Sequence, residues 1–401
     1  MEIDFLKEAK ALYRGMKKDR RYLHENAEVG FHLPKTSRYV FNRLTAMGYN
    51  VKPIGRCALI AEIGRKEKPC LLLRADMDAL PMREDSGLEF ACKDGNMHAC
   101  GHDLHAAMLL GCAMLLKKYE ARLKGRVRLL FQPAEETLEG AKACVEAGCL
   151  QSVDRALMLH VLPLQQFPTG TVIVSSAGIS APSADFFDVT FYGKSCHGSS
   201  PWQGVDALLL GAKSVTALET LSSREFSPST SATLTIGQFH AGEADNVIAE
   251  KAVLSGTLRT MSKEVREEVK RRTEEILKAT AKAFRGKVRI RYKSGCPALE
   301  NDEKMSDFLR ESCVKVLGDE RVYLSSEFPK GGVSGSEDFA YIAEKVPSVM
   351  VGICAGDHRT VGQPLHSPKV CFDETVMPYG AAVFAAAAFG YSDFFQAAKS
   401  R

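Results

Sequence analysis

Two side chains that bind metals well stand close together before an expected helix. Cys100 and His102 lie in the segment Met97–Asp103, which follows a glycine-containing loop and precedes the pattern of an amphipathic helix over Leu104–Tyr119. The spacing predicts that both residues lie at the N-terminus of that helix. A thiolate and an imidazole two positions apart can bind one metal ion or two adjacent ions.

Two neighbouring carboxylates follow an expected strand. Val127–Phe131 is a continuous apolar run, and the turn Gln132-Pro133-Ala134 connects it to Glu135 and Glu136. Paired carboxylates just beyond a strand suit a division of labour in which one binds metal and the other transfers protons. The alternative interpretation is an exposed, charged turn.

Two histidines complete the set of candidate ligands. His160 follows the apolar run Ala156–Leu159, and His366 lies in a loop between Pro364 and Pro368. Like the other candidates, they lie beyond a strand or in a loop, where open α/β sheets place their sites. A single histidine or cysteine in such a place is more often a packing residue than a ligand. Five residues of ligand type and a spare carboxylate together favour a metal centre.

The elements that must position these residues form two patterns. The first part of the chain alternates apolar runs with amphipathic stretches, which predicts an α/β domain with a central, mostly parallel sheet flanked by helices. From Ala184 the order becomes β-α-β-β-α-β, the ferredoxin-like α+β pattern. The expected elements are a strand (Phe186–Tyr192), a helix (Val205–Ser223), strands (Ala232–Phe239, Lys251–Arg259), a helix (Lys263–Phe284) and a strand (Val288–Tyr292).

After Gly295 the alternation of apolar runs and amphipathic stretches resumes, with an apolar run at Ser348–Ile353 and a closing helix over Glu374–Phe389. We therefore expect a discontinuous catalytic domain, residues 1–182 and 295–401, with a small domain of residues 183–294 inserted in it.

Composition excludes several classes of protein. The 401 residues are 45% hydrophobic and 25% charged, as in an ordinary globular protein, and no apolar stretch reaches the length of a membrane span. The net charge of +4 is small and no basic stripe stands out, so neither a nucleic-acid partner nor a membrane is expected. The chain also shows no signal-peptide pattern. We therefore expect a cytoplasmic protein whose twelve cysteines are reduced.

Several longer motifs carry a family resemblance. They are Leu23–Asn26 with Gly30-Phe31, Leu73–Pro81, His98–Asp103, Phe131–Glu136, Gly193–Ser200, Asn246–Ile248, Gly256–Thr260, Ser336–Tyr341 and Leu365–Pro368. Because these motifs follow one another in the order of the family, the chain resembles the peptidase-type, metal-dependent amidohydrolase family of aminoacylases and carboxypeptidases. Within the family it is similar to hippurate hydrolases, indole-acetyl-amino-acid hydrolases and N-acetyl-diaminopimelate deacetylases. The motifs cover nearly the whole chain and are specific for the family, but say little about the substrate.

The resemblance implies roles for residues of the catalytic domain. It implies that two divalent ions are bound by Cys100, His102, Glu136, His160 and His366. It also implies that Glu135 is the general base and that Asp78 is the supporting acidic residue. The wider family has a histidine ligand at the position of Asp76, and here Cys100 and His102 are expected to compensate. Zn²⁺ or Mn²⁺ is the expected metal, while Co²⁺ and Ni²⁺ also suit such ligands.

The resemblance also implies that the small domain is a lid through which the protein forms a homodimer. His197 is expected to stabilise the oxyanion, although it could simply be a loop histidine. Asn246 and Arg259 match positions that face the substrate, and an arginine fork suits a free carboxylate; a structural ion pair is the alternative for Arg259. Trp202 stands where relatives often carry a histidine, and we expect it to line an acyl pocket.

The expected activity is hydrolysis of the amide bond of a small N-acyl amino acid (acetyl, benzoyl or indole-acetyl). Glu135 would take a proton from water and return it to the departing amine, while His197 helps to hold the oxyanion. A small dipeptidase of the same family is one alternative. Others are a thiol hydrolase with Cys100 as nucleophile and a non-catalytic metal-binding homologue. The spare carboxylate of Glu135 argues against the last, because binding alone needs no base.

Overall fold

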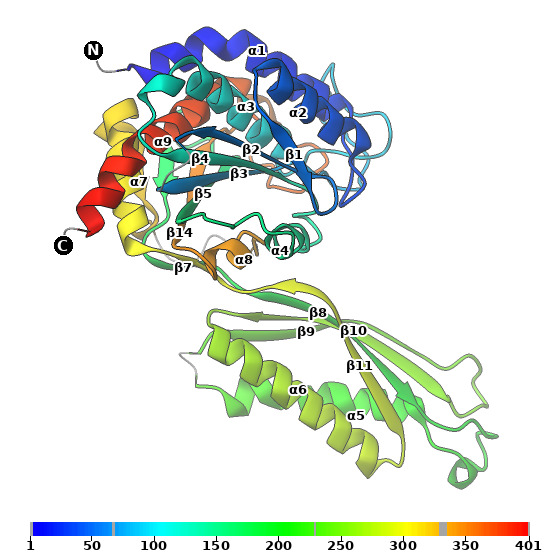
Figure 1. Ribbon diagram of the computed structural model, residues 1–401. Helices are drawn as coiled ribbons and strands as arrows, with labels where there is room; N and C mark the ends of the chain where they lie inside the picture. The colour runs from blue at the N-terminus through cyan, green and yellow to red at the C-terminus, as the bar shows by residue number, and fades with distance from the viewer. Residues whose placement is uncertain (1–2, 66–68, 228–229, 329–334, 400–401) are drawn as a thin grey trace. The chain divides into compact units, whose positions relative to one another are not determined.

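The computed structural model describes residues 3–65, 69–227, 230–328 and 335–399. The chain folds as two compact units (Figure 1). Unit 1 contains residues 1–180, 300–332 and 338–401, and unit 2 contains residues 181–299 and 333–337. The long stretch 181–299 of unit 2 is therefore an insertion in the sequence of unit 1.

Unit 1 is built around a sheet that has eight strands among the described residues, in the order β1-β2-β4-β3-β5-β14-β6-β13. These strands are β1 (Val51–Ile54), β2 (Ala58–Gly64), β4 (Arg126–Gln132), β3 (Cys70–Asp76), β5 (Arg155–Leu162), β14 (Ser348–Cys354), β6 (Val172–Val174) and β13 (Val322–Leu324). Its centre, β4-β3-β5-β14, is parallel, whereas β1, β2 and β6 join in antiparallel fashion. This confirms the predicted central sheet, and the carboxyl ends of the parallel strands meet at one edge.

Helices flank this sheet on both faces (Figure 1). Those of unit 1 are α1 (Phe5–Glu25), α2 (Pro34–Ala46), α3 (His102–Lys118), α4 (Gly140–Glu146), α7 (Glu303–Leu317), α8 (Ala340–Ala343) and α9 (Met377–Lys399). Helices α1, α3 and α9 pack against one another, and α4 packs against α8. A 3₁₀ turn over Glu374–Val376 precedes α9, so the predicted closing helix is real but extends beyond Phe389.

Helix α3 differs from the amphipathic helix that the sequence suggested. Its residues from His102 to Ala113 are all buried, because α1 and α9 cover the side that turns away from the sheet. A helix that is covered on all sides needs apolar residues all round, and α3 has them in Leu104, Met108 and Leu109. Helix α3 therefore packs between α1, α9 and the central strands β3, β4 and β5.

Unit 2 has the predicted ferredoxin-like order of elements. These are β8 (Ala184–Tyr192), α5 (Ala207–Thr220), β9 (Ala232–Ala241), β10 (Lys251–Thr260), α6 (Lys263–Ala283) and β11 (Lys287–Cys296). The strands form an antiparallel sheet in the order β11-β8-β10-β9, with α5 and α6 on one face. Apolar side chains such as Phe187, Phe191 and Leu254 fill the core between sheet and helices.

Two strands mark the junction between the units in the sequence. β7 (Gly178–Ala181) leads out of unit 1, and β12 (Leu299–Asn301) leads back into it. The two strands form a small sheet of their own. The side-chain amide of Asn301 adds a hydrogen bond of 2.8 Å to the Ser180 hydroxyl. The chain therefore leaves and re-enters unit 1 at neighbouring positions.

The helices in the described part of the chain lack the combination of length and apolar composition that a membrane span requires. The twelve cysteines all lie in the described part and are free thiols, most of them buried. This confirms the interpretation of most cysteines as small core residues.

Candidate metal centre

The loop before α3 presents Cys100 and His102 on either side of Gly101. Gly101 caps the helix in the left-handed region, with φ of 83°. A Cβ atom at this position would lie 2.3 Å from Cγ2 of Val161, so only glycine fits without movement of the β5 end. Cys100 and His102 are both buried. Their placement at the helix N-terminus is as the sequence predicted.

His102 presents one ring nitrogen to a group of carboxylates. Its Nδ1–H donates to the carbonyl oxygen of Asp78 at 2.9 Å, which leaves Nε2 as the ligating atom. Nε2 lies 3.7 Å from Asp76 Oδ2, 3.8 Å from Glu135 Oε2 and 4.0 Å from Glu136 Oε1. It is buried and has no hydrogen-bond partner among the residues that the structure describes. An uncompensated nitrogen facing carboxylates fits a cation between them.

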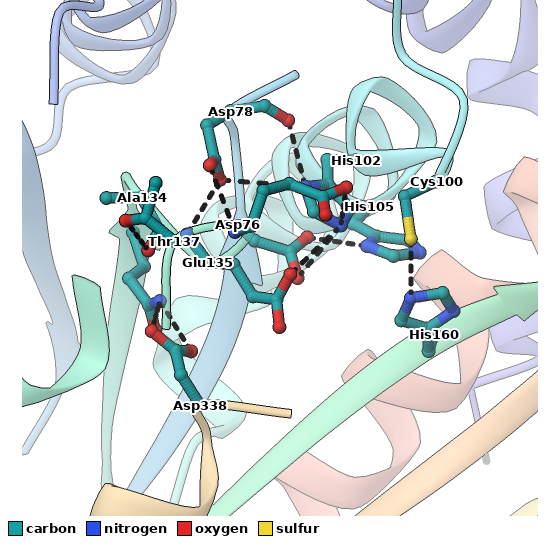
Figure 2. A network of polar contacts seen from close by, with 12 residues as sticks. Asp76, Asp78, Cys100, His102, His105, Ala134, Glu135, Thr137, His160 and Asp338 are labelled. Carbon is teal, nitrogen blue, oxygen red and sulfur yellow. Dashed lines mark hydrogen bonds and ion pairs between the residues drawn. The ribbon is translucent and has the colours of Figure 1, made fainter. Parts of the chain in front are cut away.

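His160 approaches Cys100 from the end of β5. Its Nε2 lies 3.4 Å from the Sγ atom of Cys100. A dashed line joins the two side chains in Figure 2. The other ring nitrogen, Nδ1, donates to the carbonyl oxygen of Val161 at 2.7 Å, so Nε2 is again the free ligand atom. Burial lowers the pKa of His160 to about 3, which keeps the imidazole neutral, the form that binds metals. The strand runs on to Leu162, so His160 lies within β5 rather than after it.

His366 and Glu136 close the other side of the site. His366 Nε2 lies 3.4 Å from Glu136 Oε2. Ligand atoms of Cys100, Glu136 and His366 lie within 4.8 Å of one another, as do those of Cys100, His102 and His160. His366 is exposed and has a φ of 65°, and its backbone N–H donates to the Ala99 carbonyl at 3.1 Å. Two ligand groups that share Cys100 suit two adjacent ions.

Asp78 fixes the turn that carries both glutamates. Its Oδ1 accepts the backbone N–H of Glu135 at 2.9 Å, and its Oδ2 accepts the backbone N–H of Glu136 at 3.2 Å. Ala134, just before them, has a φ of 57°, an uncommon left-handed conformation for alanine. The Asp78 side chain is completely buried. These glutamates are therefore held in a defined turn and are not an exposed charged turn. Figure 2 shows Glu135 with Asp78.

The site is electrostatically prepared for cations. Burial raises the pKa of the Cys100 thiol far above its ordinary value, so the thiolate needs a positive partner to form. Burial alone would lower the pKa of His102, but its polar neighbours, above all the carboxylate of Asp76, outweigh burial and raise that pKa. Anionic groups thus gather in a buried place where a divalent ion would compensate them.

The remaining predicted site residues lie in unit 2. His197 is exposed, and its Nδ1 accepts the Ser199 hydroxyl at 2.8 Å. Asn246 is also exposed, and its carbonyl accepts the N–H of Gly198 at 2.7 Å, which joins the two loops. Trp202 follows in a 3₁₀ turn and is 71% exposed.

Arg259, on β10, is half-buried and donates from Nη1 to the Ser336 hydroxyl at 2.5 Å. Its guanidinium also lies over the ring of Phe186, 5.7 Å from the centroid. Both partners belong to unit 2. A structural ion pair, the alternative interpretation of Arg259, would need a carboxylate as its partner. The observed partners are a hydroxyl and an aromatic ring.

Sequence reasoning missed two buried residues beside the ligands. His105 follows His102 by three positions, a spacing that places both on one face of a helix and was the available signal. Asp338 accepts the Arg74 guanidinium at 2.9 Å and lies within the motif Ser336–Tyr341. Asp338 lies 264 positions after Arg74, so no short-range sequence pattern could connect the two residues.

Comparison with known proteins supports the same family. The model of peptidase family M20/M25/M40 matches residues 72–389. An N-acetyl-L-cysteine deacetylase of Bacillus subtilis is 37% identical over 89% of this chain and 83% of its own. An IAA-amino acid hydrolase (ILR1-like 4) of Arabidopsis thaliana is 35% identical over 93% of this chain and 84% of its own.

Solved structures that are similar to this chain support the same family. A crystal structure described as an aminohydrolase, from methicillin resistant Staphylococcus aureus, has a TM-score of 0.89 and 31% identity, covering 98% of this chain and 100% of its own. A dinuclear metal binding peptidase of the M20 family from Bacillus subtilis has a TM-score of 0.79 and 30% identity, covering 96% and 99%. Together with the cluster of ligands, these similarities show that the chain belongs to peptidase family M20/M25/M40.

Proposed function

We propose that the protein is a metal-dependent amidohydrolase that cleaves small N-acyl amino acids into a carboxylic acid and a free amino acid. The observation that carries the proposal is the position of Glu135, whose Oε2 lies 3.8 Å from His102 Nε2 at the edge of the ligand cluster. The names of two relatives, a deacetylase of N-acetyl-L-cysteine and a hydrolase of IAA-amino acids, support this substrate class.

In this proposal Cys100, His102, Glu136, His160 and His366 hold two divalent ions. A related structure is described as dinuclear, which supports the number of two. When bound, such ions lower the pKa of water and polarise an amide carbonyl. Zn²⁺ suits the thiolate and imidazoles best, with Mn²⁺ next and Co²⁺ or Ni²⁺ as further options.

The protein's own groups handle the protons. Glu135 takes a proton from the attacking water and delivers it to the leaving nitrogen, a transfer that needs a carboxylate held in place. Asp78 provides that support through the backbone N–H groups of Glu135 and Glu136. A binding site alone would not need Glu135 in this position.

We assign the recognition of substrate to unit 2. Arg259 would bind the free carboxylate, Asn246 would donate to the substrate, and Trp202 would contact the acyl group. His197 would stabilise the oxyanion, reaching the site of the neighbouring subunit of a homodimer. Unit 2 is then both lid and dimerisation domain, and residues 183–294 are its proposed extent.

We also propose a cytoplasmic location. The twelve cysteines of the chain are free thiols, which supports a reducing compartment.

A thiol hydrolase fits the geometry poorly. A nucleophilic cysteine needs a lowered pKa, whereas burial raises the pKa of Cys100. His160, whose Nε2 lies 3.4 Å from Cys100 Sγ, has a pKa lowered to about 3 by burial and is a poor partner for a thiolate. The shifts of Cys100 and His160 are opposite to those of an activated Cys–His pair.

The test is a screen of N-acetyl, N-benzoyl and indole-acetyl amino acids, with dipeptides as comparison, in the presence of Zn²⁺, Mn²⁺, Co²⁺ or Ni²⁺. The readout is the released amine. We expect turnover of at least one N-acyl amino acid, loss of turnover with a chelator and recovery with added metal. Cleavage of dipeptides alone would replace the proposed substrate class by that of a dipeptidase. Activity that survives complete removal of metal would reject the metal-dependent mechanism.

A further inference from the structure

His105 is a buried imidazole in contact with two of the proposed ligands. It lies one turn after His102 on α3 and is 1% exposed. Its ring centroid lies 5.4 Å from that of His102 and 4.6 Å from that of His160. Figure 2 shows it beside both histidines.

Both ring nitrogens of His105 are already used. Nδ1 donates to Asp76 Oδ1 at 2.6 Å, and Nε2 accepts the backbone N–H of Val161 at 2.9 Å. A metal ligand must offer a free nitrogen lone pair, and the acceptor nitrogen of His105 faces an N–H group instead. His105 therefore lies next to the ligands without having their hydrogen-bonding state.

The bond to Val161 replaces a missing strand contact. Along β5, pairing with β3 ends at Met158, opposite Arg74. The N–H of Val161 lies beyond this last pair, and His105 takes the acceptor position that β3 no longer provides. The carbonyl of Val161 in turn accepts Nδ1–H of His160. The backbone of one residue, Val161, thus connects His105 to the orientation of the His160 ring.

Asp76 anchors His105 from the other side. Its Oδ2 accepts the Arg74 guanidinium at 2.6 Å, so each carboxylate oxygen has a strong donor. Arg74 also donates to Asp338 at 2.9 Å and to the Gln132 side-chain oxygen at 2.9 Å. The network therefore joins the ends of β3, β4 and β5 to α3. All of these side chains are buried.

We propose that His105 is a positioning residue of the metal centre, which locks the β5 end that carries His160 to the helix that carries His102. The role also explains the carboxylate at position 76, whose Oδ1 orients His105. The proposal rests on the proposed function only in taking His102 and His160 as ligands.

The test compares three variants by metal affinity, measured by competition of metal-free protein with a chelating indicator for Zn²⁺ and Co²⁺. His105→Ala removes both bonds. His105→Asn can still donate to Asp76, while His105→Gln places an oxygen that can accept the Val161 N–H. Loss of such supporting groups costs about 10- to 100-fold in metal affinity. We expect a loss of this size for Ala, little recovery for Asn and substantial recovery for Gln.

The number of ions and the cobalt spectrum separate positioning from ligation. All three variants should still bind two ions at saturation, with an unchanged thiolate-to-cobalt absorption per bound ion. Saturation at one ion would identify His105 as a ligand and overturn the proposal. An unchanged affinity in His105→Ala, or equal losses in all three variants, would also overturn it. If the alanine variant does not fold, the Asn and Gln pair decides the question.

His98→Asn is the matched control for loss of a buried imidazole. His98 is 2% exposed, and its ring nitrogens have no hydrogen-bond partner within the described part of the chain. We expect less than about twofold change in its metal affinity, against the about 10-fold minimum for His105→Ala. Because affinity is the readout, wild-type protein that binds two ions but cleaves no N-acyl amino acid would reject the proposed function without affecting this test.

Discussion

The carboxylate of Asp78 holds Glu135 by its backbone, through a hydrogen bond of 2.9 Å to the Glu135 N–H group. The side chain of Glu135 takes no part in this bond. The position of the main chain and the chemistry of the side chain are therefore separable, and each can be changed alone.

The first prediction uses this separation. Glu135→Gln keeps the shape and the Asp78 contact but removes the base, so both metal ions should remain while kcat falls by about 10²- to 10⁴-fold. Elemental analysis of dialysed protein and amine release measure the two quantities. Near-normal turnover would show that another group moves the proton.

The second prediction concerns the ligands. Cys100→Ala and His366→Ala should each lower the metal content of dialysed protein, because each removes one donor from the same group of ligand atoms. The exposed His240 on β9 provides the control: His240→Ala should retain full metal content. Full occupancy in both ligand variants would mean that the ions are held elsewhere.

The third prediction concerns Gly101. An alanine there adds left-handed strain of about 1–2 kcal/mol and a Cβ atom 2.3 Å from Val161 Cγ2. We expect a lower Tm together with weaker metal binding, since Val161 must move with the β5 end. Gly148→Ala is the matched control, because Gly148 has a φ of 88° but nothing within 4 Å of the added atom. Equal metal affinity in the two variants would exclude the coupling to β5.

These residues also show what the sequence could reveal. Cys100, His102 and Glu135 were predictable because each follows a local signal, a helix start or the end of an apolar strand. His105 lies on the same helix face, but its second partner is a backbone N–H on another strand, which leaves no mark in the residue types. Asp338 meets Arg74 only after the sheet has formed. The amphipathic interpretation of α3 failed because tertiary packing covers both of its sides.

The fourth prediction concerns Arg259. Arg259→Ala should raise KM for N-acyl amino acids by about tenfold or more, because a hydrogen-bonded charge pair contributes about 1.5–3 kcal/mol. KM for the corresponding amides, which lack the negative charge, should change much less. Ser336→Ala is the control, since it removes the observed hydrogen bond and keeps the guanidinium. Equal effects on acids and amides would indicate a structural role.

The fifth prediction concerns His197 acting across a dimer. His197→Ala and Glu135→Ala should each be inactive, and mixing them with subunit exchange should restore roughly one quarter of wild-type activity. Half of the dimers are then mixed, and each mixed dimer has one complete site of two. Verified exchange without recovery would place His197 at its own chain's site or outside catalysis.

The pairing of β7 with β12 has an evolutionary consequence. Because the chain departs and returns through two hydrogen-bonded strands, closing that gap directly needs only a short loop, and a short loop costs little chain entropy. Insertion at such a point leaves the order of the surrounding strands intact. The long insert of residues 181–299 can thus be gained, lost or exchanged without a change in the order of the strands that carry the ligand cluster.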